Sequence, residues 1–349
     1  MEVYTLLKII SDKKLFAGDS NLNKIETLIF PIIRVLRDES NGTFEFGYEN
    51  DLVVIKNNIE EFRIPIIKFK ENANLLLNKL KEKTKAAFSI PEIETFLNSY
   101  NSHSLKAKSS IKSDIRIVIH DHRTGITPEL GFSIKSKLGG ASTLLNAGKT
   151  TNFVYEIDNS ILDNQQIEFI NNLETKSKIR DRIKEIKHFY GNLKFIKNES
   201  SVFGNNLILI DTALPYILSE ILLKYFESGN SLISSLVSEI SSKNPLNFDL
   251  ENGHQFYSYK IKRLLTDIAL GMMPSKVWSG LLDATGGYLI VKEDGDILCY
   301  HIYNRNEFED YLFKNTKLET ASSTRHDFGR IYLENNKMFI NLNLQIRFI

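Results

Sequence analysis

Two short segments contain acidic, basic and hydroxyl side chains of the kinds that catalytic sites use. Residues 114–120 read Asp-Ile-Arg-Ile-Val-Ile-His and residues 129–136 read Glu-Leu-Gly-Phe-Ser-Ile-Lys-Ser. Apolar side chains alternate along both, which predicts two half-buried strands joined by a turn over residues 121–128. A turn centred on Thr124 and Gly125 places Asp114 opposite Lys135, with Cβ atoms roughly 5 Å apart, and puts Ser133 on the diagonal. The hairpin therefore carries an acid beside a lysine on its polar face.

This acid–lysine pair has two interpretations. Asp114 and Lys135 can form an ordinary cross-strand ion pair, which adds little stability when it is exposed. They can also form a catalytic pair. For an arbitrary Asp and Lys the ion pair is the favoured interpretation, so the decision rests on the surrounding sequence.

The surrounding sequence resembles a known group of nucleases. Lys112-Ser113-Asp114-Ile115, followed by a strand, a turn and Ser133-Ile134-Lys135, resembles the PD-(D/E)XK nuclease arrangement. Three further stretches are similar to HpaII-type restriction endonucleases: the string from Gly131 to Phe153, the ending 325–329 with 342–348, and the opening 2–8. The resemblance extends over nearly the whole chain.

The resemblance implies Mg²⁺-dependent cleavage of both strands of duplex DNA at a short palindromic site, for which the family name suggests CCGG. Asp114 and the backbone carbonyl of Ile134 would supply the hard oxygen ligands that Mg²⁺ prefers. Lys135 would position or deprotonate the attacking water and offset phosphoryl charge. A palindromic target implies a two-fold homodimer, and a cognate DNA methyltransferase is expected to be encoded nearby.

The sequence departs from the family pattern at Ser133, where an Asp or Glu is usual. Glu129 lies on the same strand face but roughly 20 Å along the strand from Lys135, so it reaches the site only if the strand bends strongly. Glu2 and Glu156 are the other candidates for the missing carboxylate, and a single-metal site is the remaining option. The incomplete acid set leaves two alternatives open: a catalytically degenerate, sequence-specific DNA-binding protein, or a DNA repair or junction nuclease.

The residues that follow the catalytic strand are expected to contact DNA. Gly139 and Gly140 permit close backbone approach, and Arg is the commonest reader of guanine. The alternative interpretations are a polar loop with a helix cap and, for Arg325, a phosphate contact or a surface ion pair. The predicted DNA-binding residues are Lys137, Ser142, Thr143, Asn146, Lys149, Thr150, Asn152, Arg325 and His326.

The elements that must position these residues follow from the apolar spacing. Helices are predicted over 1–14, 21–38, 67–85, 92–100, 164–190, 208–227, 231–242 and 256–270. Hairpins are predicted at 43–56 and 288–303, and strands at 329–334, 337–342 and 344–348. Together they predict a mixed α/β fold with a helical N-terminal subdomain over 1–100. Residues 101–349 would form the PD-(D/E)XK core, the DNA-recognition elements and a β-rich C-terminal part.

Composition sets outer limits on the function. The 349 residues contain 44 Lys and Arg against 43 Asp and Glu, so global charge does not decide whether the partner is a nucleic acid. Residues 101–150 hold eight basic and three acidic residues, which suits a polyanion. The single cysteine, Cys299, excludes an intramolecular disulfide and a cysteine-only zinc site. With no long apolar run and no signal pattern, we expect a soluble, cytoplasmic protein.

Overall fold

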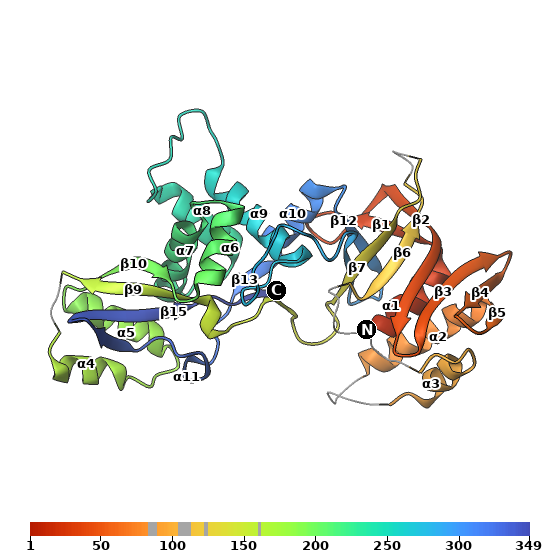
Figure 1. The fold of residues 1–349 in the computed structure, drawn as a ribbon, viewed down its shortest axis with the longest axis horizontal. Helices are drawn as coiled ribbons and strands as arrows, with labels where there is room; N and C mark the ends of the chain where they lie inside the picture. Colours follow the sequence, from red (N-terminus) through yellow and green to blue (C-terminus); the bar gives the residue numbers. More distant parts are fainter. Residues whose placement is uncertain (83–88, 104–112, 122–124, 160–161) are drawn as a thin grey trace. The chain divides into compact units, whose positions relative to one another are not determined.

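The computed structural model describes residues 1–82, 89–103, 113–121, 125–159 and 162–349. These residues form two compact units (Figure 1). Unit 1 consists of Met1–Ser142 and Leu282–Tyr311, and unit 2 consists of Thr143–Leu281 and Leu312–Ile349. The predicted boundary near residue 100 falls inside unit 1. The centre of the predicted turn at Thr124 and most of the loop predicted over 101–113 lie outside the described residues.

Unit 1 is built on a sheet whose described strands run in the order β1-β12-β11-β7-β6-β2-β3-β4-β5. Neighbouring strands are antiparallel except for two parallel pairs, β1 with β12 and β7 with β11. The strands are β1 (Lys14–Gly18), β2 (Lys24–Glu39), β3 (Gly42–Glu49), β4 (Leu52–Lys56), β5 (Glu61–Pro65), β6 (Ile115–Ile119), β7 (Glu129–Ser136), β11 (Gly287–Val291) and β12 (Ile297–His301). The two strands with the acid–lysine pattern, β6 and β7, lie in the middle of this order.

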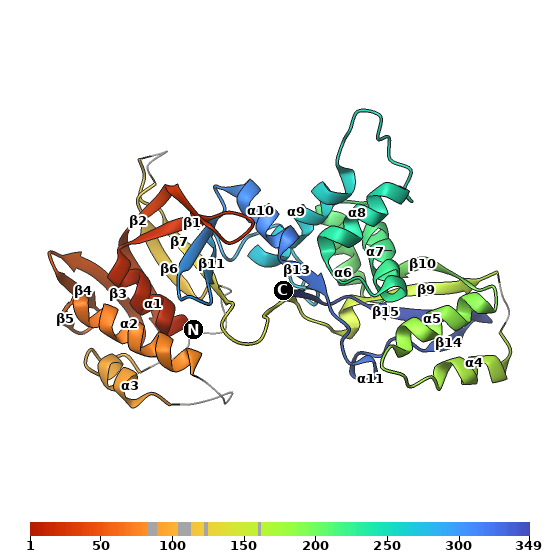
Figure 2. The same ribbon diagram turned by 180° about the vertical axis from the view of Figure 1, so that it is seen from behind.

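Helices α1 (Glu2–Asp12), α2 (Ile66–Lys81) and α3 (Pro91–Asn98) supply the rest of the unit 1 core. Leu6 and Ile10 of α1, spaced one helical turn apart, are buried in the same apolar cluster as Phe46 of β3 and Ile117 of β6. Figure 2 shows α1 and α2 lying together against the sheet. The apolar faces of β6 and β7 are therefore anchored in the core. α10 (Arg305–Lys314) begins in unit 1 and ends in unit 2.

The helix predicted over 21–38 is wrong, because these residues form the long strand β2. The segment is rich in β-branched residues, whose side chains are restricted in a helix, and it contains Pro31, which disfavours a helix interior. Register shifts in the pairing of β2 with β1 and β6 interrupt the two-residue alternation. The irregular burial pattern therefore mimics helical spacing. Because residues 1–100 contain β1–β5 as well as α1–α3, they form a mixture of strands and helices and not the predicted helical subdomain.

Unit 2 contains a four-stranded sheet with the order β10-β9-β15-β14 and a small sheet with the order β13-β16-β8 among its described residues. The strands are β8 (Thr143–Leu145), β9 (Asn152–Asp158), β10 (Asn192–Asn198), β13 (Thr316–Leu318), β14 (Ile331–Glu334), β15 (Lys337–Asn343) and β16 (Ile346–Phe348). The helices are α4 (Asn164–Asn171), α5 (Lys178–His188), α6 (Ser201–Ile210), α7 (Leu214–Ser228), α8 (Ile233–Lys243), α9 (Phe256–Leu270) and α11 (Ser323–His326).

Helices cover one face of the four-stranded sheet in unit 2. The hydroxyl of Tyr155 on β9 donates to the carbonyl of Ser219 on α7 at 2.7 Å, and Phe153 packs edge-on against Phe203 of α6. Val154, which alternates with these residues, faces the opposite way and lines a pocket with Asn341 of β15. The sheet of unit 2 therefore has one apolar, covered face and one polar face.

The mixed α/β class is confirmed, and most predicted elements are found with shifted ends. Two long predicted helices are each divided in two. Residues 164–190 form α4 and α5, and residues 208–227 span the junction of α6 and α7, where the backbone N–H of Ala213 donates to the Asp211 carboxylate and Pro215 lies in the first turn of α7. No single described helix has the length and hydropathy needed to cross a membrane. α6 and α7 meet that test only as a pair, and they are bent by 110° at their junction.

Candidate active site

The predicted hairpin exists, but its register differs from the prediction by two residues. Ile115 pairs with Phe132 and Ile117 pairs with Leu130, so Asp114 lies opposite Ser133 and diagonal to Lys135. The prediction that Asp114 directly faces Lys135 is therefore wrong. Because the error is an even number of residues, every side chain remains on the predicted face of the sheet.

Asp114 is held by the strand opposite it. The backbone N–H of Asp114 donates to the carbonyl of Phe132 at 2.8 Å, which fixes the residue at the entrance to β6. Its Oδ2 atom accepts the backbone N–H of Ile134 at 2.6 Å and the hydroxyl of Ser133 at 3.3 Å. The Oδ1 atom accepts no side-chain or backbone hydrogen bond from the described residues. One carboxylate oxygen is thus anchored, and the other remains available.

Lys135 extends from β7 over an aromatic ring. Its ammonium group lies 5.2 Å from the centre of the Tyr288 ring, a cation–π contact. Burial lowers the pKa of Lys135 below the usual lysine value, and the negative charge of Asp114 acts in the opposite direction. Tyr288 comes from β11, where it pairs with Ser133, and burial raises the pKa of its phenol. The site therefore contains an aromatic residue that the sequence analysis missed, because 288–291 reads as an ordinary buried strand.

Gly131 allows the chain to enter β6 close to β7. A Cβ atom at this position would lie 2.8 Å from the Cβ of Ser113, closer than two such carbons can approach. The position therefore requires glycine, for reasons of close packing rather than of backbone angle. Any larger residue would displace the segment that carries Asp114.

The candidates for the missing carboxylate belong to three different elements, α1, β7 and β9. Glu129 lies opposite Val118, and its carboxylate pairs with Arg116, which also makes a two-pronged contact with Asp38 at 2.9 and 3.1 Å. Glu2 begins α1 in unit 1. Glu156 belongs to unit 2, where it forms an ion pair of 2.9 Å with Lys337. Within the described residues, no group of three His, Cys, Asp or Glu side chains is arranged to hold a metal ion.

In unit 1, the residues predicted to contact DNA follow the end of β7. The backbone N–H of Lys137 donates to the carbonyl of Val291 at 2.8 Å, and burial lowers the pKa of its side chain against the effect of Glu293. Gly139 has a φ of +98°, and both it and Gly140 are exposed, so that a Cβ atom at either position would have no neighbouring atom within 4 Å. Ser142 is half-buried. The backbone at the two glycines is therefore open to a ligand.

In unit 2, two segments far apart in the sequence meet. Lys149 pairs with Asp327 at 3.0 Å, and the buried Asn152 amide donates to the carbonyl oxygens of His326 and Asp327 at 3.0 and 3.3 Å. Arg325 is exposed on α11. The side chain of Asn152 is therefore buried, and its hydrogen bonds hold the 325–327 segment in place. The other predicted residues are Thr143 and Thr150, which are half-buried, and Asn146, which is exposed.

Comparison with known proteins places the chain in a family. The family model for the HpaII restriction endonuclease matches residues 1–348. The chain is 52% identical over 351 residues to the type II restriction enzyme HpaII of Haemophilus parainfluenzae, covering 100% of this chain and 96% of that protein. No solved structure matches the chain. A match over the full length, with high identity throughout, shows that the chain belongs to the HpaII restriction endonuclease family.

Proposed function

We propose that the protein is a type II restriction endonuclease that hydrolyses both strands of duplex DNA, with Asp114 and Lys135 at its catalytic centre. The observation that carries the assignment is the meeting of these two side chains on one face of β6 and β7, with one oxygen of Asp114 anchored and the other available. Family membership supplies the reaction class. In this proposal, β2, β6, β7 and β11, together with α1, form the PD-(D/E)XK core, because they are the elements around the acid and the lysine.

The oxygen atoms around Asp114 fit a magnesium ion. Backbone groups of alternate residues in a strand point to the same side, and both Phe132 and Ile134 bond toward Asp114, so the carbonyl of Ile134 is directed to that side as well. A carboxylate and a carbonyl suffice, because Mg²⁺ commonly binds through one or two carboxylates and completes its shell with waters and phosphate oxygens. When bound, Mg²⁺ would lower the pKa of a water and neutralise charge on the phosphate.

Lys135 would act on the phosphate and on the attacking water. Its ammonium is brought near Asp114 by the diagonal pairing and is held by the Tyr288 ring. In a water-poor site a fixed positive charge stabilises the additional negative charge of the transition state more strongly than it would in bulk water. Ser133, whose hydroxyl donates to Asp114, orients that carboxylate. Glu2, Glu129 and Glu156 remain candidates for a further acid.

The experiment is digestion of supercoiled plasmid and genomic DNA with Mg²⁺ or EDTA, followed by sequencing of the cut ends. We expect double-strand cuts at one short palindrome with Mg²⁺, with CCGG as the proposed site, and none with EDTA. Asp114→Ala and Lys135→Ala should each lower the cleavage rate by roughly 100-fold or more. Lys68→Ala is the matched control, because Lys68 is an exposed cation on α2 whose ammonium pairs with Glu71 one helical turn away.

Two results would contradict the proposal. Tight, salt-sensitive DNA binding with no metal-dependent cleavage would indicate the catalytically degenerate DNA-binding protein, which Ser133 keeps as the second candidate. Cuts selected by DNA structure and not by sequence would indicate a repair or junction nuclease. Unchanged cleavage by Lys135→Ala would show that the protein is a nuclease whose catalytic centre does not include Lys135.

The proposal extends to the partners of the protein. A palindromic site is matched by two copies related by a two-fold axis, so we propose a homodimer on DNA. The predicted contacts Lys137, Ser142, Thr143, Asn146, Lys149, Thr150, Arg325 and His326 would then act on phosphates and base edges in each half-site. A restriction system also needs a DNA methyltransferase to protect the host genome, encoded nearby, and both enzymes would work in the cytoplasm.

A further inference from the structure

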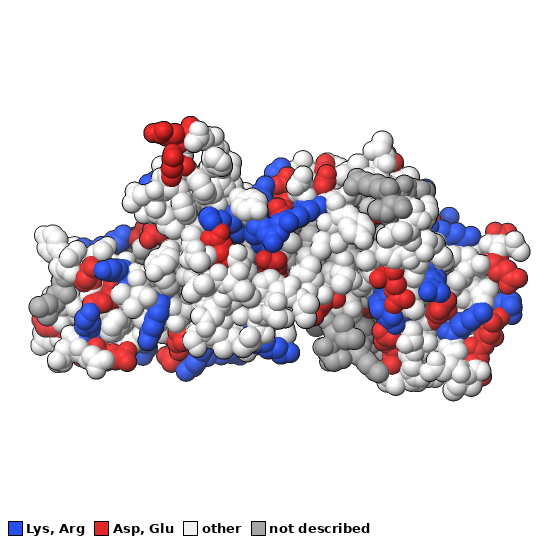
Figure 3. Space-filling view, turned by 45° about the horizontal axis from the view of Figure 1, so that its top comes forward, with Lys and Arg blue, Asp and Glu red and all other residues white. Residues whose placement is uncertain are grey.

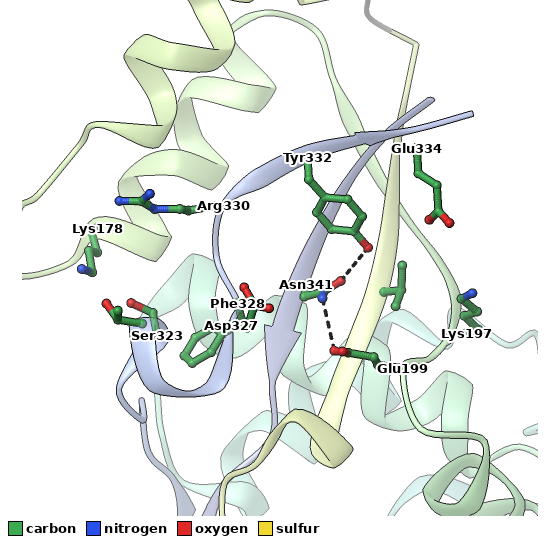
Figure 4. Close-up of a pocket in the computed structure, with 12 residues that line it drawn as sticks. Lys178, Lys197, Glu199, Ser323, Asp327, Phe328, Arg330, Tyr332, Glu334 and Asn341 are labelled. Carbon is green, nitrogen blue, oxygen red and sulfur yellow. Dashed lines mark hydrogen bonds between the residues drawn. The ribbon is translucent and has the colours of Figure 1, made fainter. Parts of the chain in front are cut away.

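The polar face of the four-stranded sheet in unit 2 contains a pocket of about 600 Å³ (Figure 4). Its wall and floor come from β9, β14 and β15, from Glu199 after β10, and from the segment around α11. All of these residues belong to unit 2, so the pocket is complete without unit 1. Its volume is within the range of sites for small organic ligands.

A chain of hydrogen bonds fixes the polar groups on the pocket floor. The hydroxyl of Tyr332 donates to Oδ1 of Asn341 at 3.0 Å, and the amide of Asn341 donates to Oε2 of Glu199 at 3.3 Å, as the dashed lines in Figure 4 show. The same Glu199 oxygen accepts the amide of the buried Asn152 at 2.7 Å. Asn343 donates to Asn152 at 2.7 Å and so extends the chain into the interior. The polar groups of the floor therefore hold one another in place through these hydrogen bonds.

The fixed floor leaves a defined set of donors and acceptors. An Asn side chain has two N–H donors and an oxygen with two lone pairs, so Asn341 retains one N–H and one lone pair side by side. The carboxylates of Glu199, Glu334 and Asp327 lie near the Tyr332 hydroxyl, and they add to the effect of burial in raising its pKa. A ligand edge with an exocyclic amino group beside a ring nitrogen would match this combination of acceptors and a donor.

The cations of the pocket stand at its edges. Lys197 forms no ion pair with any described residue, and Lys178 and Arg330 share Glu174 at 2.8 and 3.8 Å. In Figure 4, Lys178 and Arg330 lie on one side of Asn341 and Lys197 on the other. Phe328 and Tyr332 add aromatic surface between the cationic edge and the polar floor. The layout is a hydrogen-bonding floor, aromatic surface from Phe328 and Tyr332, and three cations at the edges, with three carboxylates also in the lining.

We propose that this pocket binds a single deoxynucleotide whose base is cytosine or adenine, the base edge on Asn341 and Glu199 and the phosphate toward Lys197 or Arg330. The inference rests on the proposed function, which supplies DNA as the source: one nucleotide of the recognition site would turn out of the duplex, so that its Watson–Crick edge becomes readable. A free nucleotide has the same chemistry and is the other source to be distinguished.

The test uses Lys135→Ala, which should bind the substrate without cutting it, and duplexes containing the site found by sequencing the cut ends. Each base of the site is replaced in turn by a fluorescent analogue, pyrrolocytosine or 2-aminopurine, whose emission rises when the base leaves the stack. We expect a several-fold rise at one position per half-site. Adding Asn341→Leu should abolish most of that rise and weaken DNA binding roughly tenfold.

Matched variants separate the pocket from general effects on folding. Asn192→Leu makes the same change on the same sheet outside the pocket. Tyr332→Phe removes the hydroxyl that donates to Oδ1 of Asn341 and should also reduce the fluorescence rise, and Tyr190→Phe is its control because Tyr190 is 86% exposed. Both controls should behave like the parent, and circular dichroism should show all variants folded.

Calorimetry with free dCMP, dAMP and dTMP forms the second arm. Binding of dCMP or dAMP that Asn341→Leu removes, without a fluorescence rise in DNA, supports the pocket chemistry and assigns a free nucleotide as its source.

The proposal is overturned if no position shows a fluorescence rise and none of the three nucleotides binds. It is also overturned if Asn341→Leu behaves like Asn192→Leu in both arms, or if Asn341→Leu weakens DNA binding while all bases remain stacked and no nucleotide binds. These results are distinct from a failure of the proposed function, which would appear as absent Mg²⁺-dependent cleavage in the wild-type protein.

Discussion

At the scale of single residues, the unusual feature of the site is Ser133, at a position where the PD-(D/E)XK pattern that the sequence resembles usually has an acid. The geometry shows what the serine does instead: its hydroxyl donates to the Asp114 oxygen that also accepts the Ile134 N–H. A carboxylate at this position would be almost buried and would have no proton to donate to Asp114. The serine thus stabilises the site in the absence of a cation, where two neighbouring carboxylates would repel each other.

This interpretation predicts the behaviour of Ser133→Asp. In EDTA, the added buried charge should lower the free energy of unfolding by about 1–3 kcal/mol, because it faces the carboxylate of Asp114 with no metal ion between them. Mg²⁺ should raise the melting temperature of Ser133→Asp more than that of the wild type, because binding to the native state stabilises it. Thermal unfolding with and without Mg²⁺ measures both effects, with Ser133→Asn as the uncharged control. Equal melting temperatures of the wild type and Ser133→Asp in EDTA would contradict the prediction.

A second prediction at this scale concerns the interior of unit 1. Arg37 and Glu39 of β2 form an ion pair of 3.0 Å with side chains only 2% and 1% exposed, and Ser102 donates to the same Glu39 oxygen at 2.6 Å. Glu39→Gln should destabilise the protein by about 3–5 kcal/mol, because it leaves a buried guanidinium without its counter-charge. Urea unfolding measures the loss. The double variant Arg37→Met with Glu39→Leu should recover much of it, and a double variant as unstable as the single one would argue against the charge explanation.

At the scale of elements, the site depends on β11 pairing in parallel with β7. This pairing brings Tyr288 level with Ser133 and under the ammonium of Lys135, although Lys135 and Tyr288 are 153 positions apart in the sequence.

Tyr288→Phe keeps the face of the aromatic ring and should retain most of the cleavage rate. Tyr288→Leu should lower kcat roughly tenfold with little change in KM, because the ammonium loses the contact that positions it. Single-turnover cleavage measures the rates, and thermal unfolding controls for the cavity. A Tyr288→Phe variant as slow as Tyr288→Leu would show that the hydroxyl matters and not the ring.

The elements also show what the sequence could and could not predict. Regular alternation identified β6 and β7, and it placed Asp114, Ser133 and Lys135 on one face even though the register was two residues out. β2 failed the same test because its register shifts interrupt the alternation, and its β-branched residues and Pro31 were the signals that favoured a strand. Periodicity is therefore a reliable guide to which face a side chain occupies only where the strand is regular.

The pocket in unit 2 had no comparable signal in the sequence. Glu199 and Asn341 had no signal of their own in the sequence, and Asn152 was predicted as a DNA contact and not as part of a pocket floor. Their contacts depend on the pairing of β9 with both β10 and β15, which is long-range and is not encoded in any local pattern. The segments 149–152 and 325–327 were singled out separately by the family resemblance. The two segments contact each other through Lys149 and Asn152, and local sequence patterns do not predict such long-range contacts.

At the scale of the whole molecule, charge is mixed and nearly balanced. The face drawn in Figure 3 shows basic and acidic side chains interspersed over both units, in keeping with 44 basic and 43 acidic residues. Long-range attraction of DNA to the entire protein is therefore weak, and affinity must come from local contacts made once the chain is docked. In the proposed homodimer each chain would read one half-site and contribute one acid–lysine pair, so both chains would be needed to cut both strands in a single binding event.

Mixing active and inactive chains tests this requirement. Asp114→Ala chains should fold and dimerise but not cut, and re-association of equal amounts with the wild type should leave roughly half of the dimers with one active site. If each site cuts one strand, these mixed dimers convert supercoiled plasmid into nicked circles, which accumulate before any linear product. Gel separation of the three plasmid forms over time measures the outcome, with wild type diluted in buffer as the control. If the mixture produces linear DNA with no more nicked intermediate than the diluted wild type, a single chain cuts both strands in turn and the dimer is not required for the reaction.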